Sequence, residues 1–270
     1  MVQFSGFTFS VETEKGRLPE YAFPKEEPEN TKTVYIEIPE ADQPQTFRVR
    51  ITPTVPLNFN KTLGWSFQLC LDGIVSSLWR IISRDKSPGG LLLEGLDVPN
   101  VFDPSSFDTK EMYFRPLEMT EDEEYACNVE GDHIGIIGIA IAERGRCKGW
   151  DGGALESQAH LLKGMVHEKK MKGSSATHST KLGKQLLESQ KPIGRFKLLE
   201  PVVYLRFLYR DKRRLQNLGV LPETNATPQN LKTESDSDDE APSFGMAWNS
   251  NRQEPKRAPV FIDLTTDDWE

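Results

Sequence analysis

The sequence predicts a mainly β body, an antiparallel β-sandwich or jelly-roll-like fold with minor helices, followed by a disordered acidic C-terminal tail. Two observations predict the body: short runs in which apolar and polar residues alternate, and turn-rich loops between those runs. A third predicts the tail, because aliphatic residues become scarce and Pro, Asn, Thr, Ser and Asp become common after residue 220. We therefore expect a β-rich globular domain over residues 1–220 and a tail over residues 221–270.

Composition narrows the class of protein. The longest apolar stretch, residues 134–142, is about half as long as the roughly 20 residues that a membrane-spanning helix needs, so we expect no membrane span. The first residues show neither a basic region nor a long apolar region, and we expect no secretory signal. Cys70, Cys127 and Cys147 are odd in number and far apart, which favours reduced thiols in the cytosol or nucleus.

The first strands follow from alternation with a period of two. Apolar residues face one side at Phe7, Phe9 and Val11, and the same pattern recurs over residues 34–38 and 47–51. The connection between the last two runs is too short for a crossover helix. We therefore expect those two strands to pair antiparallel.

The middle of the body predicts a hairpin and a central strand. Residues 65–71 alternate and end at Asp72-Gly73, a tight-turn dipeptide, before a second apolar run through residues 79–82. A further strand is expected over residues 112–117. Residues 134–142 are apolar on both faces, which is typical of a central strand covered on both sides.

The end of the body predicts a strand and a short helix. The strand covers residues 201–209, and the helix covers residues 211–218 with Asp211 as its N-cap and Gly219 as its stop. Residues 155–190 allow a helix that the glycine and serines at 173–175 interrupt. In all we expect about seven to nine strands.

The body shows no recognisable sequence motif of catalytic or metal-binding residues. His160 and His167 are seven residues apart, but no carboxylate completes a metal-binding pattern around them. A nucleophilic pair such as Cys127 with His133 stays open, and the acidic residues 121–124 are most simply a solvated loop. We predict no catalytic residues, no metal and no cofactor.

The net charge is concentrated in the tail. Residues 221–270 hold eleven acidic residues against four basic ones, which is seven of the eight net negative charges of the chain. A nearly neutral body lacks the broad basic field that binds nucleic acid, so we do not expect direct nucleic-acid binding. A DNA-associated protein would need a basic face that forms on folding, from Arg48, Arg50, Arg206 and Arg210.

The sharpest motif is a short apolar run near the C-terminus, alone in a polar tail and mixed with acids. Such a peptide suits addition as an extended strand to the edge of another protein's sheet. The run resembles the SUMO-interacting motif, which pairs with the edge strand of the small modifier SUMO. The resemblance implies that the SUMO-binding residues are Val260, Phe261, Ile262, Asp263, Leu264, Thr265, Asp267 and Asp268. The alternative is a terminal strand that docks back on the body.

A second tail motif lies upstream. Lys232, with Leu231 before it and Glu234 after it, resembles the SUMO acceptor consensus that docks onto the SUMO-conjugating enzyme. An acidic stretch follows, in which acidophilic kinases would phosphorylate Ser235 and Ser237. Each phosphate adds about −1.5 to −2 charges and strengthens attraction to a basic patch on the enzyme.

Several body segments resemble an uncharacterised fungal domain family of unknown function. The resemblance rests on residues 18–21, the turn at 71–73, residues 177–183 and the last strand at 204–210. It covers about residues 1–222 and implies a β-rich body and a fungal source. It implies no activity and no catalytic residues.

Together these observations predict a non-enzymatic interaction or scaffold protein. Its body binds an unknown protein partner, and its tail binds SUMO or sumoylated proteins. We expect a nuclear location, with the cytoplasm as the alternative. The rival interpretation is an enzyme or small-ligand-binding β-sandwich whose tail is regulatory.

Overall fold

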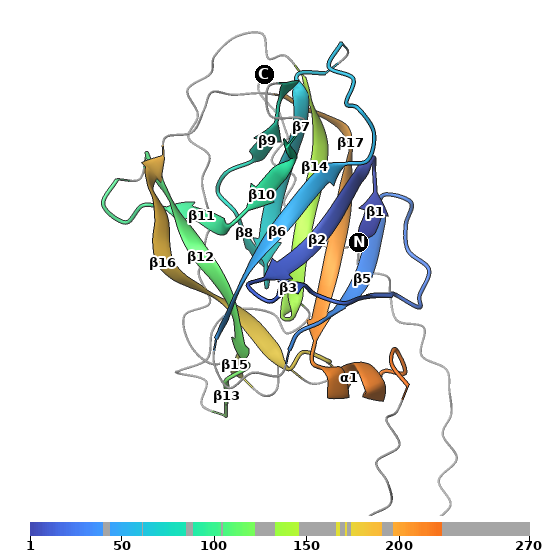
Figure 1. Ribbon diagram of the computed structural model, residues 1–270. Coiled ribbons are helices and arrows are strands. Elements are labelled where there is room, and N and C mark those ends of the chain that lie inside the picture. The colour runs from blue at the N-terminus through green and yellow to red at the C-terminus, as the bar shows by residue number, and fades with distance from the viewer. Residues whose placement is uncertain are drawn as a thin grey trace, which may run out of the picture. The chain divides into compact units, whose positions relative to one another are not determined.

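The fold is that of a computed structural model, in which two β-sheets pack face to face (Figure 1). The structure describes residues 1–39, 44–60, 62–84, 89–103, 105–121, 133–145, 166–167, 171, 174–190 and 197–222. The chain divides into two units, of which the first, Met1–Thr224, holds the described residues, and the second, Asn225–Glu270, lies outside them. Within the described residues no helix combines the length and apolarity that a membrane crossing requires.

The first sheet has eight strands and is antiparallel throughout. Its centre is formed by β6, which pairs with β2, β10 and β12. The strands are β1 (Val2–Phe4), β2 (Phe7–Thr13), β3 (Gly16–Arg17), β6 (Gln45–Pro53), β10 (Leu91–Leu93), β11 (Gly95–Pro99), β12 (Phe107–Pro116) and β16 (His178–Gln190).

The second sheet has seven strands and is mixed, because β17 pairs parallel with β5 and antiparallel with β14. Its strands are β4 (Glu20–Ala22), β5 (Thr31–Glu37), β7 (Gly64–Leu71), β8 (Ile74–Val75), β9 (Arg80–Ile82), β14 (Ile136–Gly145) and β17 (Lys197–Arg210). A separate parallel pair joins β13 (Met119–Thr120) to β15 (Val166–His167).

The core fills the space between the inner faces of the two sheets. Phe7 on β2 packs edge to face on Phe67 of β7, with ring centroids 5.1 Å apart. Phe114 on β12 contacts Tyr209 on β17 at 5.0 Å. These aromatic contacts join strands of opposite sheets, so the alternation of apolar residues in each strand is the cause of the two-layer packing.

The mainly β prediction is confirmed, but one strand pairing is wrong. The strands at 34–38 and 47–51 do not pair with each other, because β5 belongs to the seven-stranded sheet and β6 to the eight-stranded sheet. A connection of that length suits a link between two packed sheets as well as a hairpin. The local sequence does not distinguish the two, since both strands bury one face.

Two further expectations need correction. The strand at 134–142 is central, between β7 and β17, but its outer face is only partly buried, whereas Ile137, Ile139 and Ile141 on its inner face are fully buried. Residues 178–190 form strand β16, which the sequence did not predict. The described residues thus hold more strands than the seven to nine expected. Within the interval 155–190, where a helix was considered, residues 155–165 lie outside the described residues and residues 178–190 form a strand.

The predicted hairpin is confirmed. Asp72 and Gly73 form the two central positions of its turn, with φ angles of 49° and 83°, and β8 pairs back onto β7. Positive φ at both positions is the type I′ geometry that matches the twist of the flanking strands. The second apolar run continues as β9, which pairs with the beginning of β7.

The predicted short helix is confirmed as α1 (Lys212–Asn217). The Asp211 side chain caps its N-terminus by accepting a hydrogen bond from the backbone N–H of Arg214 at 2.7 Å. Replacing Asp211 with Ala is expected to lower the free energy of unfolding by about 1 kcal/mol, because an N–H at the helix start loses its acceptor. Chemical denaturation measures the change, and Asp211→Asn, which keeps an acceptor, is the control that should lose far less.

Candidate functional site

A cluster of arginines lies on the outer face of the eight-stranded sheet. Glu12 on β2 stands directly opposite Arg17 on β3 and directly opposite Arg48 on β6. Arg50 follows two residues after Arg48 and therefore lies on the same face. We call Arg17, Arg48, Arg50 and Glu12 the arginine cluster. It forms because the alternation that buries Phe47, Val49 and Ile51 sends the residues between them outward.

Glu12 holds two of these arginines in place. Arg50 donates from Nε to Oε1 at 2.8 Å and from Nη2 to Oε2 at 3.2 Å, and Arg48 donates from Nε to Oε2 at 3.3 Å. The hydrogen bond from Arg50 lowers the pKa of Glu12, so the carboxylate is ionised at neutral pH. Glu12 thus pairs with two guanidinium groups, so these three side chains together keep one net positive charge, and Arg17 adds a further positive charge from the neighbouring strand β3.

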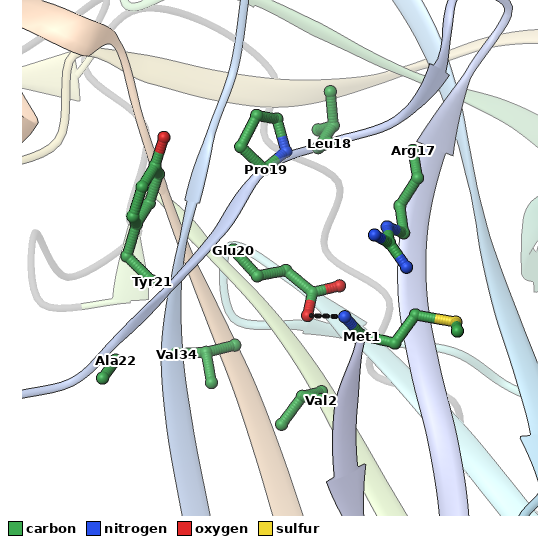
Figure 2. Close-up of a pocket in the computed structure, with 9 residues that line it drawn as sticks. All are labelled: Met1, Val2, Arg17, Leu18, Pro19, Glu20, Tyr21, Ala22 and Val34. Atoms are coloured by element: carbon green, nitrogen blue, oxygen red, sulfur yellow. Dashed lines mark ion pairs between the residues drawn. The ribbon is translucent and has the colours of Figure 1, made fainter.

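A groove that shares Arg17 with the arginine cluster is lined by residues from strands of both sheets (Figure 2). Its volume is about 480 Å³. The Met1 ammonium lies 2.9 Å from Oε2 of Glu20. The other carboxylate oxygen of Glu20 is buried without a hydrogen-bond partner in the described part of the chain. The groove is lined by the N-terminal residue, by residues of β1, β3, β4 and β5, and by the segment between β3 and β4: Met1, Val2, Arg17, Leu18, Pro19, Glu20, Tyr21, Ala22 and Val34.

Arg17 belongs to both the groove and the arginine cluster. Figure 2 shows its side chain reaching in from β3, across from Glu20. Tyr21 turns its hydroxyl away from the groove and donates to Glu37 at 2.6 Å, while burial raises the pKa of Tyr21 to about 12. None of the nine lining residues is Ser, Thr, Cys or His. The groove and the cluster thus offer charge and hydrogen bonds for binding.

A second polar group is fully buried and has a structural role. The Asp72 carboxylate is completely buried in the hairpin turn and accepts hydrogen bonds from three other strands or strand ends. The donors are the backbone N–H groups of Gly135, Ile136 and Thr180, the Thr180 hydroxyl and the Tyr209 hydroxyl, at 2.6–3.2 Å. Burial raises the pKa of Asp72, and the hydrogen bonds from Thr180 and Tyr209 oppose that rise.

Arg210 extends this buried network toward the segment before β16. Its Nη1 donates to the carbonyl oxygens of Gly135 and Tyr209 at 2.8 and 2.7 Å, and its Nε donates to Ser175 at 2.8 Å. These three hydrogen bonds are all made within the protein. Arg210 is 4% exposed, so its charge serves the interior rather than a ligand.

A buried ion pair joins the two sheets at another point. Arg80 on β9 donates from Nε to Oδ2 of Asp97 on β11 at 2.8 Å. Asp97 is 1% exposed and also accepts from the Thr109 hydroxyl at 2.7 Å. Removing Arg80 would leave the buried Asp97 carboxylate without its charged partner, so this pair also has a structural role.

The basic face considered for DNA binding does not form. Arg48 and Arg50 lie on β6 of one sheet, whereas Arg206 and Arg210 lie on β17 of the other, and Arg210 is buried. Sequence reasoning instead missed the pairing of Glu12 with Arg48 and Arg50. The alternation of both strands predicts that Glu12, Arg48 and Arg50 face outward. Their contact could be predicted only if the pairing of β2 with β6 were known.

The remaining predicted residues divide between the described part of the chain and the rest. Burial raises the pKa of the Cys70 thiol to about 11, which makes it a poor nucleophile at neutral pH. His178 accepts from or donates to the Thr177 hydroxyl at 2.9 Å, and burial lowers its pKa. Cys127, Cys147, His160 and residues 122–124 lie outside the described residues.

All predicted residues of the tail also lie outside the described residues. These are the acceptor pair Lys232 and Glu234, the phosphorylation sites Ser235 and Ser237, and the SUMO-binding run Val260, Phe261, Ile262, Asp263, Leu264, Thr265, Asp267 and Asp268. Their roles therefore stay predictions from the sequence.

Comparison of the sequence with known protein families finds one family that matches most of the chain. The model of the family described as "Domain of unknown function (DUF7918)" matches residues 6–224. The match begins just before β2 and ends just after α1, so it includes the arginine cluster and the Asp72 network. No curated protein and no solved structure matches the chain.

Proposed function

The chain belongs to the DUF7918 family, an uncharacterised domain family, and we propose that it is a non-enzymatic interaction protein whose C-terminal tail binds SUMO. The family description assigns no activity, so the proposal rests on the residues themselves. The observation that carries it is the run from Val260 to Thr265, an isolated apolar strand with acids inside and just after it.

The chemistry of the run suits pairing with a sheet edge. In an extended peptide Val260, Ile262 and Leu264 point to one side, where they fill an apolar groove beside the edge strand. Backbone hydrogen bonds set the register. Asp263, Asp267 and Asp268 add attraction to basic residues around the groove and speed the encounter. The peptide must order on binding, so the affinity of one motif is modest.

The upstream motif couples binding to modification. About 28 residues separate Lys232 from Val260, and a flexible chain of that length has an r.m.s. span of roughly 30 Å. SUMO held at the apolar run, alone or carried by its conjugating enzyme, is therefore presented to Lys232 at high effective concentration. Phosphate on Ser235 or Ser237 strengthens the acidic extension that follows the acceptor.

The body supports a binding role in this proposal. Its arginine cluster and adjoining groove present charge at the surface, whereas Asp72 and Asp97 are engaged by hydrogen bonds inside the fold. We propose that the body selects a protein partner and that the tail adds SUMO or a sumoylated protein, in the nucleus.

The test of the proposal is calorimetric titration of SUMO into the full chain. We expect saturable binding with a one-to-one stoichiometry and a dissociation constant in the micromolar range. The absence of binding at millimolar SUMO would contradict the proposal.

Replacing Lys232 with Arg is expected to abolish most SUMO conjugation in a reaction of the full chain with the activating and conjugating enzymes. Arginine keeps the charge but has no primary amine to form the isopeptide bond. Lys256→Arg, a tail lysine outside the acceptor consensus, is the matched control and should leave conjugation unchanged. Equal conjugation of Lys232→Arg and wild type would show that the acceptor lies elsewhere.

A further inference from the structure

We infer that the arginine cluster, Arg17, Arg48 and Arg50 around Glu12, is a binding site for an acidic, serine-phosphorylated protein segment. This inference goes beyond the tail's interaction with SUMO and concerns a different surface. Three observations carry it: the excess positive charge of the cluster, the geometry in which Glu12 fixes the guanidinium groups, and the exposure of the donors that remain.

The cluster leaves donors available for a ligand. Arg48 uses only its Nε toward Glu12, and Arg50 uses Nε and Nη2. Within the described residues both Nη atoms of Arg48 and the Nη1 of Arg50 thus retain hydrogen-bonding capacity. The side chains of Arg48 and Arg50 are 44% and 40% exposed, so a ligand reaches these donors from solvent. Oxyanions are the partners that planar guanidinium forks bind best.

Glu12 prepares the cluster for such a ligand. Its side chain is 15% exposed, and the hydrogen bond from Arg50 lowers its pKa, so its charge is fixed near neutral pH. The bidentate contact holds the Arg50 guanidinium in one orientation before any ligand arrives. Pre-ordering of a long side chain reduces the entropy that binding would otherwise cost.

The surplus of guanidinium groups over the one carboxylate that binds them favours a dianionic ligand. A phosphoserine carries about −1.5 to −2 charges at pH 7 and meets this requirement. Recognition of phosphorylated and acidic peptides by small arginine clusters is a recurring binding mode. A nucleic-acid duplex presents many phosphates along its length, whereas the charge of the body as a whole is nearly neutral.

The probe is a fluorescein-labelled peptide of residues 231–242 of this chain, with phosphate on Ser235 and Ser237 or on neither. This peptide has the required chemistry, an acidic segment with serines, and is added in trans to the unphosphorylated full chain. Fluorescence anisotropy measures its affinity. We expect the phosphorylated peptide to bind about tenfold tighter than the unphosphorylated one, with an affinity that falls as salt is added.

The variant Arg48→Gln/Arg50→Gln is expected to weaken binding of the phosphorylated peptide by about tenfold or more. Both side chains are partly exposed, so the fold should persist, which circular dichroism checks. The matched control, Lys32→Gln/Lys184→Gln, removes two positive charges at exposed positions of β5 and β16 and should change affinity less than about twofold.

Three results would overturn the inference. The first is equal loss of affinity in the two double variants, which would mean general electrostatic attraction. The second is equal affinity for the phosphorylated and unphosphorylated peptides. The third is displacement of the phosphorylated peptide by a DNA or RNA oligonucleotide that binds more tightly and also depends on Arg48 and Arg50.

Discussion

Replacing Asp72 with Asn is expected to lower the free energy of unfolding by about 3–5 kcal/mol, more than any other substitution proposed for this protein. The Asp72 carboxylate accepts hydrogen bonds from five donor groups. An asparagine side chain would place its own N–H donors against some of them, and those donors would stay unpaired in the interior. Asparagine tolerates the positive φ of the turn, so the change measures the network rather than backbone strain.

The measurement is urea unfolding of the full chain followed by far-ultraviolet circular dichroism. Asp103→Asn makes the same chemical change at an exposed loop position and should cost less than about 1 kcal/mol. Tyr209→Phe removes a single donor and should fall between the two. A loss for Asp72→Asn no greater than that for Asp103→Asn would show that the buried carboxylate does not hold the turn, β14, β16 and β17 together.

The triple variant Val260→Ala/Ile262→Ala/Leu264→Ala is expected to weaken SUMO binding by about a hundredfold or more. Each substitution removes most of an apolar side chain from the face that fills the groove, and each contributes about 1 kcal/mol or more to binding. Alanine leaves the backbone able to extend. The loss of affinity therefore measures the contribution of the three apolar side chains to SUMO binding. Calorimetry with the full chain measures it.

The matched control replaces three apolar tail residues outside the run: Phe244→Ala/Met246→Ala/Trp248→Ala. This variant removes at least as much apolar surface from the same tail. SUMO binding should stay within about twofold of wild type. If both triple variants weakened binding equally, general hydrophobic attraction would explain it and the motif would not.

The sequence was sufficient for features set by local pattern. Alternation located β2, β6 and β7, the Asp72-Gly73 dipeptide fixed a turn, and Asp211 marked the start of α1. In each case the residues of the segment itself indicate the local structure, without knowledge of distant partners. The apolar periodicity of the body was likewise enough to predict a mainly β fold.

Features that depend on distant partners were beyond the sequence. Whether β5 pairs with β6 or with β17 is decided by packing across the whole sandwich, not by the short connection between β5 and β6. Strand β16 was not predicted because Lys181, Gly183 and Lys184 interrupt the alternation of apolar and polar residues that indicates a strand. Asp72 was predicted as a turn residue, and its role in joining four segments depends on Gly135, Thr180 and Tyr209, up to 137 positions away.

The arginine cluster shows the same division. Outward positions for Arg48 and Arg50 follow from the alternation of β6, but their contact with Glu12 requires that β2 lie beside β6 in one particular register. A one-residue slip would place Glu12 on the inner face of the sheet. Surface sites built across strands therefore need the fold before they can be recognised.

The proposed addition of the tail to SUMO as an extra strand is tested most directly by one NMR measurement. Isotope-labelled SUMO is titrated with the unlabelled full chain and followed by NMR, beside the Val260→Ala/Ile262→Ala/Leu264→Ala variant. We predict chemical-shift changes confined to the edge strand of SUMO and the groove beside it, and their loss with the variant. Shift changes elsewhere on SUMO, or no changes at millimolar concentration, would contradict the claim.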